Sequence, residues 1–429
     1  MLDMLKAAGA NIVEFDEKAD IYIVNTCSVT NIADKKSRQM LHRARKMNPD
    51  GIVIAAGCYV QSAREILEQD EAIDIVISNN KKKSITEIVN DYINVRNNEK
   101  NAPGKDHEAM EYFVDISRET EYEEMGGHVP VGHTRAYVKI QDGCNQFCSY
   151  CIIPYVRGRI RSRSQEAILA EVSELAEAGI KEVVLTGIHI SSYGKDKNNE
   201  GALIELIEAI SKIKGIKRIR LGSLEPGIIT EEFVERISSN SKVCPHFHLS
   251  LQSGCDSVLK RMNRKYTCEQ YFEKCDMLRK AYKSPALTTD VIVGFPGETE
   301  EEFAETVRYL TELNLYEMHI FKYSPRKGTV AAAMKEQVSP EIKNERSDVL
   351  LKLAHDNKTA YESQFEGCEL EVLVEEVVKK NNKTYLRGHT ERYMDILIDV
   401  GDISMPESFV NSFVYVTYTQ NGGNLPLLL

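Results

Sequence analysis

The stretch Gly143-Cys144-Asn145-Gln146-Phe147-Cys148-Ser149-Tyr150-Cys151 decides the fold of this chain, because it places three cysteines at the spacing C-x-x-x-C-x-x-C. Only ten of the 429 residues are cysteine, so chance rarely produces this spacing. Three thiolates this close in sequence can hold three irons of one cuboidal iron–sulfur cluster, and the fourth iron then stays open for a molecule that must be bound and reduced. We predict that Cys144, Cys148 and Cys151 are metal ligands and form the catalytic centre.

Two other interpretations of the triplet stay open from spacing alone: a zinc site and a surface disulfide. Three cysteines suit zinc poorly, because a closed structural zinc site takes four ligands. The chain has no apolar run long enough to span a membrane and no secretory pattern at its N-terminus. We therefore predict a cytoplasmic protein whose cysteines are kept reduced.

The sequence that continues from the triplet, GCNQFCSYCIIPYVRGRIRSR over residues 143–163, resembles the methylthiotransferase branch of the radical S-adenosylmethionine enzymes. Within that branch it is most similar to the tRNA N6-threonylcarbamoyladenosine methylthiotransferases, and the similarity covers nearly the whole chain. The resemblance implies a transferase with an S-adenosylmethionine cofactor and a 4Fe-4S cluster. It also implies that a deoxyadenosyl radical attacks carbon 2 of the modified adenine at position 37, next to the anticodon, which then receives a methylthio group.

Residues 1–96 alternate short β-branched runs with helical segments, a pattern typical of a parallel sheet covered by helices. Cys27 and Cys58 each follow one of these runs, at the sheet edge where ligands bind in open α/β folds. Read alone, both would more often be packed core thiols. The resemblance implies that they are two of three ligands of an auxiliary 4Fe-4S cluster in an N-terminal methylthiotransferase domain.

The third cysteine of that auxiliary set has no counterpart in this sequence. The resemblance places it after a first strand, in a Gly-Cys turn, whereas this sequence begins in the helix that follows. A parallel sheet without that strand would leave an unpaired edge. Our expectation is that the chain is truncated at its N-terminus and that, as written, it cannot close the auxiliary cluster.

The remaining chain divides into three predicted parts. We predict a linker over residues 97–133, a radical SAM domain over 134–362 and a TRAM domain over 363–429. The central part alternates six strand runs with helices, which predicts a partial (β/α)6 barrel of the TIM type, with its chemistry at the carboxyl ends of the strands. The six runs are AYVKIQ, EVVLTG, RIRLGS, FHLSLQ, TDVIVGF and MHIFKYS.

Unusual residues follow these runs on the same predicted rim. By resemblance, the cofactor-binding residues are Gly187, Gln252, Ser253, Arg264, Gly294 and Gly297. Glycines there let the backbone approach a ligand, and Arg264 (or the nearby Arg261) could neutralise a carboxylate. Glu225, in the segment SLEP, is placed among the substrate contacts. Thr299 and Glu302 are predicted to cap the next helix.

Four arginines alternate at every second position after the triplet: Arg157, Arg159, Arg161 and Arg163. In an extended strand all four would project from one face. A solvated loop is the plain interpretation. The functional one is a contact with RNA phosphates and with the carboxylate of threonylcarbamoyladenosine, which isopentenyladenosine lacks. We expect alanine at positions 159 and 161 to impair threonylcarbamoyl substrates most.

The last part reads as a small all-β barrel that resembles the TRAM module, which related enzymes use to hold RNA. Its acids outnumber its bases, so composition alone indicates a packing domain. Arg387 and Arg392 are the predicted RNA contacts, together with His389, Tyr385 and Tyr393. The remaining cysteines show no ligand spacing and are predicted to be structural.

Composition restricts the partners of this chain. A net charge of -11 and a pI of about 5.6 argue against binding nucleic acid through bulk charge, so any RNA must meet local basic patches. The resemblance implies a tRNA anticodon stem-loop and an electron-donor protein such as flavodoxin or ferredoxin as partners. Three alternatives stay open: an enzyme for isopentenyladenosine, one for a ribosomal-protein aspartate, or a catalytically dead RNA-binding iron–sulfur protein.

Overall fold

The computed structural model describes residues 1–28, 30–98, 112–126, 134–381, 383–401, 405–419 and 422–424. Most of the predicted linker, residues 99–111 and 127–133, lies outside the described residues. The chain forms two compact units. The first comprises residues 1–128, 142–161 and 324–333, and the second comprises residues 129–141, 162–323 and 334–429. The predicted domain boundaries remain a prediction.

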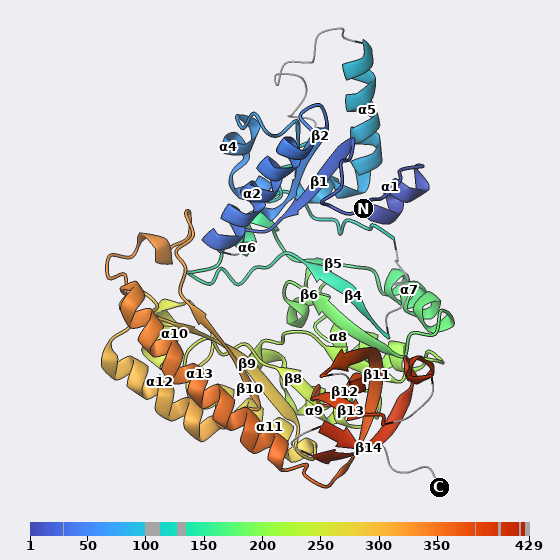
Figure 1. Cartoon of the computed structure of the whole chain (residues 1–429). Coiled ribbons are helices and arrows are strands. Elements are labelled where there is room, and N and C mark those ends of the chain that lie inside the picture. Colours follow the sequence, from blue (N-terminus) through green and yellow to red (C-terminus); the bar gives the residue numbers. More distant parts are fainter. Residues whose placement is uncertain are drawn as a thin grey trace. The chain divides into compact units, whose positions relative to one another are not determined.

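The first unit contains a parallel sheet with strand order β1-β2-β3, as the alternation of β-branched runs and helices predicts. Helices α2 and α5 lie against opposite faces of it (Figure 1). Leu41 packs on one face and Ile85 on the other, which is why the middle strand is buried throughout. The elements are α1 (Leu2–Ala7), β1 (Ile21–Thr26), α2 (Asn31–Met47), β2 (Ile52–Gly57), α3 (Cys58–Ser62), α4 (Arg64–Glu68), β3 (Ile75–Ile77), η1 (Asn79–Ser84), α5 (Ile85–Asn98), α6 (Ile153–Val156) and η5 (Ala331–Ala333).

The second unit contains a half-barrel of six parallel strands. Two sheets, β5-β4-β6-β7 and β10-β9-β8, are linked by isolated parallel bridges such as Leu224 to Leu249. The six main strands are β4 (Arg135–Asp142), β6 (Glu182–Gly187), β7 (Arg218–Leu221), β8 (His246–His248), β9 (Ala286–Val293) and β10 (Glu317–Lys322). A further strand of two residues, β5 (Arg161–Ser162), lies at the sheet edge beside β4. Each of the six predicted runs coincides with one of the six main strands, so the predicted partial barrel is confirmed.

Helices cover the outer side of the half-barrel, and a single apolar core joins them to the strands. Val172 and Leu310 belong to this core because each lies on the apolar stripe of an amphipathic helix. The helices are α7 (Gln165–Glu177), η2 (Ile190–Ser192), η3 (Lys195–Lys197), α8 (Ala202–Ser211), η4 (Pro226–Ile228), α9 (Glu231–Ser238), α10 (Asp256–Arg261), α11 (Cys268–Ala281), α12 (Glu300–Leu313) and α13 (Pro340–Ser363).

The C-terminal strands close into a small barrel of the order β11-β12-β13-β15-β14, drawn in red in Figure 1. Its interior is filled by alternate side chains such as Val372, Leu386 and Ile398, which are fully buried. This confirms the predicted all-β module. The elements are β11 (Glu369–Lys380), β12 (Lys383–Thr390), β13 (Asp395–Asp399), η6 (Pro406–Phe409), β14 (Phe413–Thr419) and β15 (Gly422–Asn424).

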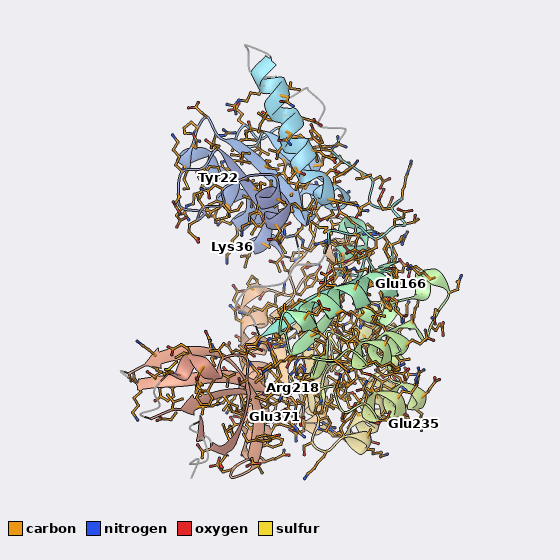
Figure 2. All side chains as sticks on the ribbon, turned by 90° about the vertical axis from the view of Figure 1, so that its right-hand side faces the viewer. Tyr22, Lys36, Glu166, Arg218, Glu235 and Glu371 are labelled. Atoms are coloured by element: carbon orange, nitrogen blue, oxygen red, sulfur yellow. The ribbon has the colours of Figure 1, made fainter. Side chains whose placement is uncertain are left out.

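A buried ionic cluster fastens this small barrel to the half-barrel. The guanidinium of Arg220 donates to Glu182 at 2.9 Å and to the carbonyl oxygen of Glu391 at 3.0 Å. Arg218 donates to the carboxylate of Glu371 at 3.0 Å, and Figure 2 shows the two side chains beside each other. Burial raises the pKa of Glu182, but the charge and hydrogen bonds of Arg220 lower it by a larger amount. The pKa is therefore below its usual value, and the carboxylate stays ionised. The C-terminal barrel is therefore bound through paired charges as well as apolar contacts.

No helix in the described ranges of this chain combines the length and the apolar character that a membrane crossing requires.

Candidate functional site

The cysteine triplet lies on one loop of the first unit, between β4 and α6. The amide of Cys144 donates to the carbonyl of Gly158 at 3.0 Å, which ties the start of the loop to a later turn. The amide of Gln146 donates to the sulfur of Cys144 at 3.4 Å, and the amide of Cys151 donates to the carbonyl of Cys148 at 2.9 Å. The loop therefore folds back on itself around its first sulfur.

The donor set of this loop fits an iron–sulfur cluster. All three side chains are soft thiols, and an amide N–H directed at a sulfur is the kind of hydrogen bond that tunes such clusters. Cys144 is 8% exposed, whereas Cys148 and Cys151 are partly exposed. All ten cysteines are among the described residues and none forms a disulfide, so the surface-disulfide interpretation was wrong.

Two residues with left-handed backbone set the shape of the loop. Gly143 has φ of +72°, and a Cβ there would lie 1.7 Å from the carbonyl oxygen of Arg159. Phe147 has φ of +50°, which is uncommon for a residue with a side chain. The guanidinium of Arg159 lies over the Phe147 ring at 4.5 Å and stabilises this conformation.

We expect Gly143→Ala to displace the triplet loop. The methyl group meets backbone rather than a flexible side chain, so the loss of unfolding free energy should exceed about 3 kcal/mol. Urea denaturation and iron content measure the effect. Gly126→Ala is the control, because its φ is +80° but a Cβ meets nothing within 4 Å. It should cost only about 1 kcal/mol. Equal effects of the two substitutions would contradict this account of the loop.

The predicted auxiliary ligands Cys27 and Cys58 lie at one edge of the N-terminal sheet. Thr26 at the end of β1 is the register partner of Gly57 at the end of β2, and each cysteine comes one residue later. Parallel strands place such residues next to each other at the carboxyl edge. Cys58 is 6% exposed and Cys27 is exposed.

Arg157 contacts the sulfur of Cys58, which the sequence pattern did not predict. Its Nε donates to Cys58 Sγ at 3.0 Å, and its Nη1 lies 3.4 Å from Asp142. Burial lowers the pKa of Arg157, but Asp142, Cys58 and Cys27 raise it by more, so the guanidinium stays charged. Arg157 therefore holds a positive charge within hydrogen-bond distance of the Cys58 sulfur.

The predicted row of four arginines on one exposed face was wrong. Arg157 ends α6 with helical backbone angles, and Gly158 is left-handed, so the segment is not extended there. Arg161 is 1% exposed and lies 3.9 Å from Asp142, while Arg163 is 5% exposed and pairs with Glu171. Of the four, only Arg159 is exposed.

A polar cluster lies in the second unit at the carboxyl ends of β6 and β7. His189 Nε2 lies 3.0 Å from a carboxylate oxygen of Glu225, and Arg264 lies 3.6 Å from its other oxygen. Burial raises the pKa of Glu225, but His189 and Arg264 lower it by more, so the carboxylate is ionised. Sequence reasoning included Glu225 and Arg264 but missed His189 and Tyr266, whose hydroxyl accepts from Arg264 at 2.8 Å. His189 could have been found as a polar residue just past a strand end.

Gln252 and Ser253 follow β8 in an unusual backbone turn. Gln252 has φ of +76°, and its amide and carbonyl both bond to β9, at Asp290 and Ile292. A non-glycine residue held left-handed at a rim position is a common feature of ligand sites. Ser253 is 1% exposed and lies 3.4 Å from the hydroxyl of Thr306, so its hydroxyl also supports the fold.

The three predicted cofactor glycines are all needed by the protein itself. A Cβ at Gly187 would lie 2.9 Å from the carbonyl oxygen of Gln141, and one at Gly294 would lie 2.3 Å from Lys343. Gly297 is left-handed with φ of +75°. Close contacts within the protein and positive φ angles are therefore sufficient to explain why glycine stands at these three positions. Their role in binding the cofactor remains a prediction.

Glu302 caps α12 together with Thr299, as predicted, and also receives two hydrogen bonds from Arg261 at 2.9 and 2.6 Å. These bonds lower the pKa of Glu302 from about 4.5 to about 2, although burial opposes them. Because the folded pKa is depressed, the stabilisation is complete above about pH 4.5 and is lost as the pH falls towards 2. Relative to wild type, Glu302→Gln should be less stable by about 1 kcal/mol at neutral pH and equally stable at pH 2. Thermal melts across this range test it, and a pH-independent difference would contradict it.

The predicted RNA contacts of the C-terminal barrel differ in exposure. Arg387 is 44% exposed and pairs with Asp395 at 2.8 Å. Arg392 is 15% exposed and donates to the carbonyl oxygens of Ser284 and Lys283 at 3.0 Å. Arg392 therefore fastens the C-terminal barrel to the segment between α11 and β9 of the same unit, and Arg387 is the more accessible of the two arginines.

Comparison with known proteins identifies two protein families that match this chain. The Radical SAM superfamily matches residues 138–310, and the family described as uncharacterized protein family UPF0004 matches residues 1–78. Threonylcarbamoyladenosine tRNA methylthiotransferase MtaB of Bacillus subtilis is 39% identical over 395 residues, 92% of this chain and 85% of that protein. The tRNA-2-methylthio-N(6)-dimethylallyladenosine synthase of Thermoanaerobacter pseudethanolicus is 35% identical over 427 residues, 97% of this chain and 86% of that protein.

The fold also matches a solved structure. The radical S-adenosylmethionine methyltransferase TsrM of Kitasatospora setae superimposes with a TM-score of 0.55 at 15% identity, covering 74% of this chain and 66% of that chain. At that identity the likeness concerns the fold alone. The sequence relatives, by contrast, match nearly end to end at well above 30% identity. This chain belongs to the radical S-adenosylmethionine tRNA methylthiotransferase family.

Proposed function

We propose that this protein methylthiolates carbon 2 of N6-threonylcarbamoyladenosine at position 37 of tRNA, giving 2-methylthio-N6-threonylcarbamoyladenosine. The observation that carries the proposal is the Cys144, Cys148 and Cys151 loop, whose thiols fit a cluster with one open iron. The similarity to the MtaB proteins of Bacillus subtilis and Aquifex aeolicus, at 39% and 37% identity, supports the substrate.

The proposed cofactors are S-adenosylmethionine, a 4Fe-4S cluster on the triplet, and an auxiliary cluster for which this sequence supplies two of the three expected ligands, Cys27 and Cys58. When bound, the first cluster supplies the electron that cleaves S-adenosylmethionine, and the auxiliary cluster supplies the sulfur. The chain's own contribution is binding and orientation. Arg157 keeps a positive charge beside Cys58 and donates a hydrogen bond to its sulfur.

The rim of the half-barrel is the proposed seat of the S-adenosylmethionine. Glu225 is ionised and held by His189 and Arg264, so it can accept hydrogen bonds from an ammonium group or a ribose hydroxyl. Gly187, Gly294 and Gly297 lie at or just after the carboxyl ends of β6 and β9, and Gln252 adds a side-chain amide at a constrained turn. Together these groups would orient the cofactor rather than transform it.

Arg159 and Arg387 are the proposed RNA contacts, because they remain exposed while Arg161, Arg163 and Arg392 are held within the protein. Arg159 presents a flat cation next to an aromatic ring, an arrangement that stacks on unpaired bases. We expect Arg159→Ala to weaken binding of an anticodon stem-loop about tenfold, since loss of a stacking partner costs about 1–3 kcal/mol. Fluorescence anisotropy measures it. Arg308→Ala, on the outer helix α12, is the control and should bind like wild type. Unchanged affinity of the Arg159 variant would contradict the assignment.

A second candidate is methylthiolation of isopentenyladenosine, favoured by the 35% identity to the dimethylallyladenosine synthase. Mass spectrometry of tRNA nucleosides separates the two. A strain that lacks the gene should lose 2-methylthio-N6-threonylcarbamoyladenosine and regain it on complementation. Loss of the isopentenyl derivative instead would assign the second substrate. No change in either, together with no reductant-dependent release of deoxyadenosine, would favour an RNA-binding protein without catalysis.

The predicted electron donor, a flavodoxin or ferredoxin, stays part of the proposal, as do the domain boundaries at residues 96, 133 and 362.

A further inference from the structure

Three polar side chains meet on the inner face of the half-barrel. They are His248 on β8, Asp290 on β9 and His319 on β10. The parallel register sets His319 directly beside Asp290 and pairs His248 with Thr288, two residues earlier on β9. Their ligand atoms all lie within 4.8 Å of one another. The neighbouring residues Phe247, Val291 and Met318 pack into the outer core, so the three polar groups face the opposite side.

The contacts of His248 fix the orientation of its ring and leave one ring nitrogen without a hydrogen bond to any described residue. Its Nδ1 lies 3.0 Å from the hydroxyl of Thr288, which fixes the ring orientation. Its Nε2 lies 3.4 Å from a carboxylate oxygen of Asp290, but this nitrogen is buried and makes no hydrogen bond within the described structure. A buried polar nitrogen left without a bond destabilises a folded protein by about 1–3 kcal/mol, and a bound ligand that accepts from it would offset this cost.

His319 extends the group towards solvent. Its ring stacks on that of His248 with centroids 5.8 Å apart and planes 21° apart, and it is itself exposed. The cluster therefore offers two imidazoles, which can donate hydrogen bonds, and one carboxylate, which accepts them. A ligand that fits must carry both a negatively charged acceptor and an N–H or O–H donor.

The threonylcarbamoyl group has this combination, with a carboxylate, ureido N–H groups and a hydroxyl, whereas an isopentenyl group has none of them. The arginines predicted to read its carboxylate do not serve that role as a pair, since Arg161 is fully buried against Asp142. We propose that His248, Asp290 and His319 form the recognition site for the carboxylate-bearing ureido substituent of the substrate adenine. His319 and His248 donate to the carboxylate, and Asp290 accepts from the ureido N–H or the hydroxyl. The inference rests on the function proposed above and names the residues that choose its substrate.

The test compares two anticodon stem-loops that differ only at the carboxyl group of the substituent: one carries threonylcarbamoyladenosine and the other its uncharged methyl ester. Wild type should prefer the free acid by about tenfold in kcat/KM, as expected for a hydrogen bond to a charged group. His319→Phe keeps an aromatic ring but removes both nitrogens, and it should reduce the preference severalfold through a lower kcat/KM for the free acid, because only His248 of the cluster is then left to donate. His319→Gln should restore part of the preference. His355→Phe, at an exposed histidine on α13, is the control and should keep it.

The possible outcomes separate the two proposals. If wild type methylthiolates neither RNA, the proposed function fails and this site fails with it. If wild type acts on both RNAs equally, or if His319→Phe reduces both activities equally, only the recognition site is wrong. Equilibrium binding of the two RNAs, measured on variants with matched thermal melts, gives the same comparison without turnover. Metal analysis completes the test, since one equivalent of zinc or iron lost specifically in His319→Phe would assign the cluster to a metal and overturn the proposal.

Discussion

Replacing Cys148 with alanine is expected to remove the cluster and all cleavage of S-adenosylmethionine. The loop offers three sulfurs, one for each of three irons of the cluster. If one of these sulfurs is removed, no other cysteine in the loop can replace it as a ligand. The anaerobically reconstituted variant should lose about four irons per chain and the broad visible absorbance of a 4Fe-4S cluster. Release of deoxyadenosine in the presence of dithionite should fall below detection.

Cys368→Ala is the matched control for this substitution. Cys368 is exposed and lies at the start of the C-terminal barrel, outside the triplet loop. Its replacement should leave iron content and deoxyadenosine release at the wild-type level. Retention of both properties in Cys148→Ala would show that the triplet is not the catalytic centre.

Replacing Glu182 with glutamine is expected to give the largest loss of stability in the second unit. The carboxylate is 2% exposed and neutralises two buried guanidinium groups, those of Arg220 at 2.9 Å and Arg218 at 3.9 Å. Glutamine keeps the shape but removes the charge, so Arg220 stays buried without its counterion and, among the described acidic residues, Arg218 keeps only Glu371. Breaking one partner of such a pair costs about 3–5 kcal/mol. Denaturant unfolding should show this loss in the unit that contains the half-barrel and the C-terminal barrel.

Glu208→Gln provides the comparison for the buried pair. Glu208 forms an equally short contact with Arg236, at 2.8 Å, but both side chains are substantially exposed. Solvent screens that pair, so its loss should change stability little. If the two substitutions destabilise the protein equally, burial is not what makes the Glu182 cluster important.

The sequence predicted the elements that rest on local periodicity. The runs DIYIVNTC and GIVIAAGC became β1 and β2 because β-branched residues bounded by helical segments favour parallel strands. Cys27 and Cys58 then had to lie together, since the register pairs Thr26 with Gly57. The position of the triplet after β4 followed from the same alternation.

The arginine row shows where such reasoning fails. Alternation at every second residue implies one face only if the backbone is extended, and Gly158 with φ of +71° interrupts it. Arg161 then turns inward to Asp142 instead of towards solvent. Whether a charged side chain is buried depends on partners distant in sequence, as with Arg163 and Glu171 or Arg220 and Glu182. No local pattern encodes those pairings.

The inner-face histidines illustrate a signal that was present but not used. In FHLSLQ, apolar Phe247 and Leu249 alternate with polar His248 and Ser250, which predicts a strand with one apolar and one polar face. Polar residues on the inner face of a half-barrel are candidates for ligand contacts. What the sequence could not supply was the register that brings Asp290 and His319 to the same place.

The most direct test of the central claim is product analysis with the purified, reconstituted protein. Anticodon stem-loop RNA containing threonylcarbamoyladenosine is incubated anaerobically with S-adenosylmethionine, dithionite and sulfide, and its nucleosides are analysed by mass spectrometry. We predict 2-methylthio-N6-threonylcarbamoyladenosine, formed together with deoxyadenosine and absent with Cys148→Ala. Unmodified nucleoside and no deoxyadenosine, from protein that carries its full complement of iron on the triplet, would contradict the account.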